Sequence, residues 1–312
     1  MPISIYLAVL ILSLFRIAQS PYYHKDFDYK MKFFKPVIEE LLKNKMDSTF
    51  VYSMIANPKT HFNERYVKIN VTGYLKQAEP ENPVTWRALS RCRSFIHENH
   101  KKLSEAENLF GVPKESIVSI LWIETRLGTY LGSNHVISVF LSTAMANKPQ
   151  FIEMNLTAFH DSFYGSKEET DSLEKKIIKR SQSKSEWAMK ELEALWKMSN
   201  ISPVSVKDLQ GSWAGAFGMP QFLPSSYNKW AVDGNDDGEI NLFDTDDAIF
   251  SIANYLAAHG WKNEDDLSKK NAVYKYNNSW DYVTNVLKLA EKLLPEPEPE
   301  DGTNVQPGGE NK

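Results

Sequence analysis

Apolar residues recur at helical spacing along most of the chain, and they are densest between residues 111 and 128. Ile117 and Leu121 share one helical face there, because residues four apart lie in line. Other apolar residues cover nearly the whole circumference, and a helix that is apolar all round is buried. Pro113 suits the first turn of such a helix and Gly128 suits its stop. The pattern predicts a buried helix between these two residues.

A glutamate stands where this helix is expected to carry a core residue. Glu124 falls in line with Ile117 and Leu121. Apolar surroundings disfavour the ionised form of a carboxyl group and raise its pKa, which is how a general acid keeps its proton near neutral pH. The alternative is a glutamate that pairs with Arg126 or a more distant base and keeps its carboxylate in solvent. The helix alone does not decide between the two.

The remaining pattern is also helical, so the predicted fold class is mainly α. Periodic apolar segments occur at 33–42, 86–100, 136–145, 187–196, 247–259 and 283–293. Residues 147–187 are polar and charged. The basic cluster within them is interpreted as the solvated face of a helix, because both signs of charge are interleaved around it, and a small patch for an acidic polymer is the alternative.

Composition adds two exclusions. With 312 residues, 42% of them hydrophobic, the chain can form one large or two ordinary globular domains. A formal net charge of -4 gives no electrostatic case for nucleic-acid binding. Cys92 is the sole cysteine, so no intramolecular disulfide forms.

Both ends of the sequence differ in composition from the rest. Residues 1–20 hold an apolar run and a small-x-small exit at Ala18–Ser20, which predicts an export signal peptide. Arg16 lies between the run and the exit, so retention as an N-terminal anchor is the alternative, and membrane association is expected only through that segment if uncleaved. Residues 295–312 are rich in Pro, Glu and Gly and are expected to be disordered.

A glycine-rich stretch at 211–224 follows the polar region. Its glycines let the backbone approach another group closely. Ser212 and Gln221 are polar residues in apolar and aromatic company, and buried polar side chains need partners. Composition leaves open whether these partners are internal or belong to a ligand.

A calcium-type loop comes next. Oxygen-bearing side chains alternate at Asp233, Asn235 and Asp237, and Gly238 takes the sixth position. The twelfth position holds Asp244 in place of the usual Glu, and Asp is one methylene shorter, so Asp247 is the other candidate for the last ligand. An Asx-rich turn followed by a helix capped by Asp244 is the alternative interpretation.

Separated motifs in the sequence together resemble the B-type lytic murein transglycosylases, over about residues 86–294. They are Gly111-Val112-Pro113, Glu124-Thr125-Arg126-x-Gly128, the segment 211–227, the calcium-type loop, and the segments 254–261 and 276–282. The resemblance implies a lysozyme-like catalytic core at 103–294, with a helical N-terminal region at 21–102 and an EF-hand-like loop at 233–247.

The resemblance also implies an activity and a location. The expected substrate is peptidoglycan in the periplasm or cell envelope, and its glycan strands are the expected partner. The expected reaction is lyase cleavage of the β-1,4 bond from N-acetylmuramic acid to N-acetylglucosamine, which leaves a 1,6-anhydromuramic acid end. Glu124 then serves as both acid and base, because the substrate supplies its own nucleophile. A hydrolytic muramidase and a non-catalytic peptidoglycan- or calcium-binding module are the alternatives.

Carried over residue by residue, the family's site falls on positions that the motifs match. Catalysis falls on Glu124. Substrate binding falls on Ser212, Gln221, Tyr255, Tyr276, Asn277 and Tyr282. A structural Ca²⁺ falls on Asp233, Asn235, Asp237, Glu239 and Asp247, the glutamate through its carbonyl. Residues 147–187 make the chain longer than the family's usual pattern, which leaves one wall of the groove undetermined.

Overall fold

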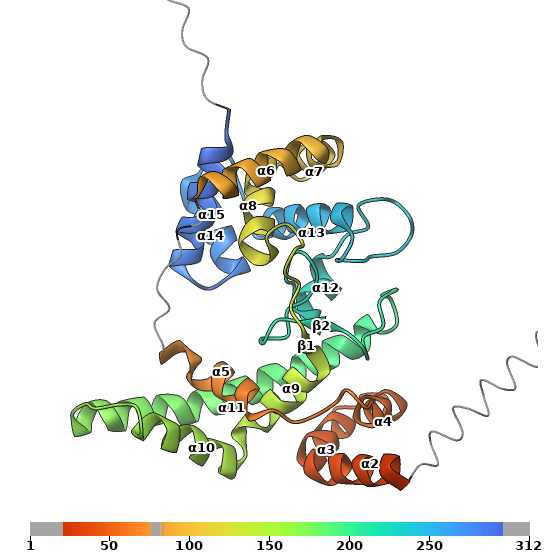
Figure 1. The fold of residues 1–312 in the computed structure, drawn as a ribbon, viewed down its shortest axis with the longest axis vertical. Helices are drawn as coiled ribbons and strands as arrows, with labels where there is room; N and C mark the ends of the chain where they lie inside the picture. Colours follow the sequence, from red (N-terminus) through yellow and green to blue (C-terminus); the bar gives the residue numbers. More distant parts are fainter. Residues whose placement is uncertain (1–20, 76–81, 83, 296–312) are drawn as a thin grey trace, which may run out of the picture.

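The computed structural model describes residues 21–75, 82 and 84–295, and its fold is mainly α-helical, which confirms the predicted class. The predicted signal peptide at 1–20 and all but the first residue of the predicted disordered tail at 295–312 lie outside the described residues. The described helices form two groups, joined by a short two-stranded sheet (Figure 1). In the part of the chain that is described, no helix is long and apolar enough to cross a membrane.

The first group, in the lower half of Figure 1, is built around helix α9, Val136–Ala144. Every residue of α9 is buried, as expected for a helix that is apolar all round. Helix α11 packs along α9, and α5 contacts both. The other elements of this group are α2 (Pro21–Phe33), α3 (Lys35–Lys43), α4 (Ser48–Ala56), α5 (Glu64–Thr72), η1 (Gly73–Leu75), η2 (Met145–Asn147), α10 (Pro149–His160) and α11 (Lys167–Met198).

The second group, in the upper half of Figure 1, is built around the predicted buried helix, α8, Lys114–Thr125. Helices α15, α6, α13 and α7 pack against α8, so its apolar circumference is covered on several sides. The other elements of this group are α6 (Trp86–Glu98), α7 (His100–Phe110), α13 (Thr245–Ala258), α14 (Asp266–Tyr276) and α15 (Trp280–Leu293). Helix α6 therefore packs against α8, although α6 precedes residue 103, where the lysozyme-like domain was expected to start.

Helix α11 is longer than the sequence pattern predicts. The predicted helix starts at residue 187, but α11 begins at Lys167, where Ser166 and Glu169 form a capping box. The basic cluster interpreted as a solvated helix face lies in α11, and its lysines are exposed. No helix start before residue 187 was predicted, because the buried face there is short and partly polar, with Ile177, Ser181 and Ser185 at four-residue spacing. The polar stretch is thus a helical hairpin of α10 and α11.

The junction between the two groups is a sheet that the sequence did not predict. Strand β1, Asn134–His135, pairs antiparallel with β2, Gln210–Gly211, and two-residue strands leave no alternating pattern to detect. The expected close approach at the glycines is confirmed, and the partner is the chain itself. A Cβ on Gly211 would lie 2.1 Å from the carbonyl oxygen of Ala216, so no other residue fits there. Helix α12, Pro224–Trp230, follows this junction.

Candidate active site

Glu124 is the penultimate residue of α8, where the helix gives way to an unusual backbone segment. The helix ends at Thr125, three residues before the predicted stop, because Arg126 takes a left-handed conformation with φ 52°. Leu127 and Gly128 follow with φ 59° and 85°. Left-handed backbone costs a non-glycine residue about 1 to 3 kcal/mol, and such strain concentrates at functional sites. The strained segment directly after Glu124 favours a functional role for this end of the helix.

The side chain of Glu124 is partly buried, and its carboxyl group is held by one tyrosine. Tyr282, on α15, donates a hydrogen bond from its Oη to Oε1 of Glu124 at 2.6 Å. Burial raises the pKa of Glu124 to about 7, and the hydrogen bond from Tyr282 acts in the opposite direction. Among the described residues, no neighbouring carboxylate contributes to this shift. Glu124 therefore combines a raised pKa with a fixed orientation.

Two further tyrosines predicted for the groove pack beside this pair. The rings of Tyr276 and Tyr282 are nearly parallel, with centroids 6.4 Å apart, and Tyr255 meets Tyr276 edge-on at 4.9 Å. Tyr276 donates its hydroxyl proton to the carbonyl of Pro220 at 2.5 Å, and Tyr255 donates to the carbonyl of Lys275 at 2.7 Å. These two hydroxyls hold the backbone around the site, and Tyr276 is partly exposed.

The glycine-rich segment supplies Gln221 and Ser212, and both have internal partners. Gln221 sits at φ 52° and donates from Nε2 to the carbonyls of Gly218 at 2.9 Å and Leu131 at 3.3 Å. Its amide oxygen has no partner among the described residues. Ser212 Oγ accepts the backbone N–H groups of residues 214 and 216, which shapes its own loop. Gln221 thus keeps its amide oxygen for a ligand, and Ser212 keeps its hydroxyl proton.

The structure brings some of the predicted residues together and leaves one apart. Glu124, Tyr282 and Tyr276 form one cluster, and Gln221 joins it because Tyr276 bonds to the carbonyl of the preceding Pro220. Asn277 lies at the C-terminal end of α14, and its side chain is exposed. A contact between Asn277 and this cluster stays a prediction.

Thr125 is a positioning residue that the sequence reasoning missed. Its fully buried Oγ1 donates to the carbonyl of Met219 at 2.9 Å and accepts from the N–H of Gly128 at 3.0 Å. These bonds fix the end of α8 to the segment that carries Gln221. The sequence feature that could have indicated this role was a threonine directly after Glu124, at the end of a largely apolar helix.

A second buried carboxylate, Glu191 on α11, has a separate structural role. It accepts hydrogen bonds from Ser225 through the backbone N–H at 2.9 Å and the hydroxyl at 2.7 Å. Ser225 stands in the first turn of α12, where a negative charge complements the unpaired N–H groups of a helix. Glu191 is therefore committed to α12 and not to Glu124.

The calcium-type loop lies between α12 and α13 and is folded by its own acidic side chains. Asp233 accepts from the N–H of Gly238 at 2.8 Å, and Gly238 has the positive φ, 88°, that a tight turn at the sixth position requires. Asp244 caps α13 by accepting from the N–H groups of residues 246 and 247. Asp247 instead turns back into the loop, where it accepts from Gly234 at 2.8 Å and Asn241 at 2.6 Å.

This geometry distinguishes the two candidates for the last ligand. Asp244 is occupied at the helix start, whereas Asp247 is almost fully buried beneath the loop. Nowhere in the described ranges do three His, Cys, Asp or Glu side chains gather closely enough to hold a metal ion. The expected set also includes an amide and a backbone carbonyl, and both are oxygen ligands of the kind that Ca²⁺ binds.

Comparison with known proteins agrees with the fold and motifs. Residues 67–270, about two thirds of the chain, match the transglycosylase SLT domain, so the chain belongs to that family. It is 33% identical over 174 residues to membrane-bound lytic murein transglycosylase B of Escherichia coli K12. That alignment covers 56% of this chain and 39% of the relative, so the chain matches about two fifths of that protein's length.

Solved structures resemble the fold at low sequence identity. Soluble lytic transglycosylase SltB1 from Pseudomonas aeruginosa superimposes with a TM-score of 0.61 at 22% identity, over 83% of this chain and 98% of that one. SltB3 from the same organism, solved with NAG-NAM-pentapeptide, gives a TM-score of 0.60 at 20% identity, over 85% and 79%. The resemblance to B-type lytic transglycosylases expected from the motifs is thereby confirmed.

Proposed function

We propose that this protein is a lytic transglycosylase that cleaves peptidoglycan, with Glu124 as its single acid and base. The observation that carries the proposal is the partly buried Glu124 carboxyl, with its pKa raised to about 7 by burial and its orientation fixed by Tyr282. Family membership and the murein transglycosylase relative support the substrate class. The bond cut is the β-1,4 link from N-acetylmuramic acid to N-acetylglucosamine.

The first step is a proton transfer. Tyr282 occupies Oε1 of Glu124, so the carboxyl proton resides on Oε2 and faces the glycosidic oxygen. Glu124 gives this proton to the leaving oxygen as the bond from C1 of the muramic acid breaks. The acetamido oxygen of the same sugar stabilises the positive charge that develops at C1. Gln221, through its free amide oxygen, is assigned to hold the acetamido N–H.

The second step closes a ring within the substrate. Ordinary glycosidases use a second carboxylate as base or nucleophile. In this site the ionised Glu124 removes the proton from the C6 hydroxyl, and O6 bonds to C1 to form the 1,6-anhydro ring. The proton returns to Glu124, so no water is consumed and the enzyme is regenerated.

The calcium-type loop is assigned a structural Ca²⁺. Asp233, Asn235, Asp237 and Asp247 would hold it by side-chain oxygens and Glu239 by its carbonyl. The Escherichia coli lytic transglycosylase Slt35, similar in fold at a TM-score of 0.53 and 22% identity, has been solved in complex with calcium. The ion would lock the segment between α12 and α13 and supply no chemistry to Glu124.

The location follows from the substrate. Peptidoglycan lies in the bacterial envelope, so the protein is assigned to the periplasm or cell envelope, with residues 1–20 as export signal or anchor. In domain terms, residues 103–294 would form the catalytic unit and 21–102 a helical region that supports it.

Replacing Glu124 by Gln tests the catalytic assignment. We expect Glu124→Gln to lower release of soluble fragments from purified cell-wall sacculi by about 10²- to 10⁴-fold, because a positioned acid–base residue contributes that much. Circular dichroism should show an unchanged helical spectrum. A variant that keeps more than about a tenth of the wild-type rate would place the acid elsewhere.

A further inference from the structure

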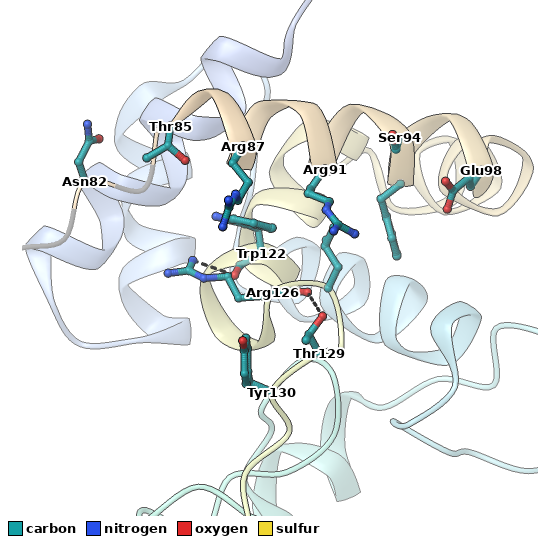
Figure 2. A pocket seen from close by; sticks show the side chains of 12 residues that line it. Asn82, Thr85, Arg87, Arg91, Ser94, Glu98, Trp122, Arg126, Thr129 and Tyr130 are labelled. Atoms are coloured by element: carbon teal, nitrogen blue, oxygen red, sulfur yellow. Dashed lines mark hydrogen bonds between the residues drawn. The ribbon is translucent and has the colours of Figure 1, made fainter.

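A pocket of about 770 Å³ lies between α6 and the end of α8 (Figure 2). Trp122 lines it, and this residue stands two positions before Glu124. On an α-helix that spacing turns a side chain by about 160°. The pocket is therefore on the face of α8 that points away from the Glu124 carboxyl, and the mechanism above makes no use of it.

The lining of the pocket is strongly basic in a chain that is acidic overall. Three arginines, Arg87, Arg91 and Arg126, line it together with one carboxylate, Glu98, a local charge of plus two. The whole chain has a formal net charge of -4. We call this concavity the arginine pocket. A basic pocket on an acidic molecule is suited to an anionic group.

Two of these arginines are exposed and unpaired among the described residues. Arg87 and Arg91 are exposed on α6, and neither forms an ion pair with another described residue. They stand four residues apart, and like charges at that spacing destabilise a helix slightly. Figure 2 shows both side chains reaching from α6 toward the end of α8. Arg126, the residue after α8, also lines the pocket, and its guanidinium carbon lies 4.9 Å from the centroid of the Trp122 ring.

The edge of the arginine pocket leads directly to the site. Leu127, Thr129 and Tyr130 line the pocket, and the next residue, Leu131, offers its carbonyl to Nε2 of Gln221 at 3.3 Å. The segment 127–131, directly after α8, thus borders the pocket and also binds Gln221, which is assigned to contact the substrate. The backbone at the end of α8 therefore connects the arginine pocket with the segment that carries Gln221.

We propose that the arginine pocket binds the carboxylates of the stem peptide on the muramic acid while the sugar chain lies at Glu124. This inference rests on the proposed function, because the peptide is part of that substrate. A guanidinium group offers a planar fork of donors that matches a carboxylate. Trp122 and Leu127 give apolar surface for the peptide's aliphatic groups. The arginines of α6 thus favour strands that carry peptides.

A comparison of two glycan substrates tests this assignment. Purified strands with intact stem peptides and strands stripped by an amidase are digested by the full chain and by the Arg87→Gln/Arg91→Gln variant. We expect the ratio of kcat/KM on intact to stripped strands to fall about tenfold in the variant, through KM, because charge-assisted hydrogen bonds are lost. Arg93→Gln removes one positive charge from α6 outside the pocket and should keep the wild-type ratio.

A ratio unchanged in the double variant, or lowered equally by Arg93→Gln, overturns the proposal. A second measurement separates it from the proposed function. The free pentapeptide has no glycosidic bond to cut, and titration calorimetry should give it a Kd about tenfold tighter for wild type than for the double variant. Equal binding, or no binding to wild type, also overturns the inference. Wild type that cleaves neither strand contradicts the proposed function, and the titration then decides on the pocket alone.

Discussion

At Glu124, burial and a hydrogen bond act on one carboxyl group in opposite directions. Burial disfavours the charged form, and the hydroxyl of Tyr282 favours it. Burial dominates, so the pKa lies near 7. The residue can then give its proton and take one back within the same pH range, as a single acid–base group requires. Substitutions at Glu124 and at Tyr282 test the effect of burial and the effect of the hydrogen bond separately.

The first prediction at this scale concerns stability. The folded pKa of Glu124 lies above its ordinary value, so the folded protein loses stability as pH rises from about 4.5 through 7. Glu124→Gln removes this penalty. At pH 8 we expect the variant to be more stable than wild type by about 1 to 3 kcal/mol, and near pH 4.5 the difference should almost vanish. Urea denaturation at the two pH values measures it.

Glu153→Gln serves as the control, because Glu153 is exposed on α10. Its stability difference from wild type should be small and independent of pH. If Glu124→Gln behaves like this control at both pH values, the carboxyl of Glu124 is not desolvated in the folded protein.

The second prediction concerns Tyr282. Tyr282→Phe removes the hydrogen bond that lowers the pKa of Glu124, so that pKa should rise further. Because the acid must be protonated to act, the alkaline limb of kcat/KM against pH should move upward by about one unit. Tyr274→Phe removes a hydroxyl from neighbouring α14 and should leave the profile in place. A downward shift in Tyr282→Phe would contradict the assigned role of its hydroxyl.

The sequence predicted these residues unequally. Helical phase alone indicated Glu124, since it shares the buried face of an apolar helix. The partnership of Glu124 with Tyr282 joins positions 158 residues apart, so no local spacing reveals it. Only the motif resemblance indicated Tyr282, and it did not specify the hydrogen bond. Arg87 and Arg91 were missed because exposed arginines on a helix are ordinary until the fold brings a pocket to them.

At the scale of elements, helices with strong apolar periodicity were predictable and those with polar buried faces were not. Helices α8 and α9 are buried all round, and the pattern found both. The part of α11 before residue 187 buries serines, and Ser185 donates to the carbonyl of Ala144 at 2.6 Å. A hydroxyl that satisfies a backbone group in the core carries no hydrophobic signal. Strands β1 and β2 depend on contacts between distant segments and have no local signature.

The calcium-type loop is the element whose prediction is most direct to test. We expect 1 mM Ca²⁺ to raise the melting temperature by several degrees and a chelator to reverse this, because an ion bound only to the folded state stabilises it. Asp237→Asn keeps the oxygen that accepts the N–H of Glu239 but removes a charge, so the calcium response should shrink.

Asp266→Asn is the matched control, since Asp266 is exposed and pairs with Lys269 at the surface. Its calcium response should equal that of wild type. Identical melting curves of wild type with calcium and with chelator would contradict the assignment of Ca²⁺ to this loop.

At the scale of the whole molecule, the two helical groups meet where the chemistry is assigned. The backbone from the end of α8 runs through Leu131 to β1, and β2 leads into the segment that holds Gln221. Substrate contacts therefore depend on the junction as well as on either group. The mainly α fold and the family were predictable from the motifs, whereas this arrangement was not, because it depends on the packing of segments distant in sequence.

The identity of the product tests the central claim most directly. The account assigns one carboxylate to the reaction, so the substrate's C6 hydroxyl must be the nucleophile and no water is added. Mass spectrometry of sacculi digested by the purified protein should therefore show 1,6-anhydromuramic acid ends, 18 Da lighter than reducing ends, an offset of about one water. Digests that contain only hydrated reducing ends would contradict the account and indicate a hydrolytic muramidase.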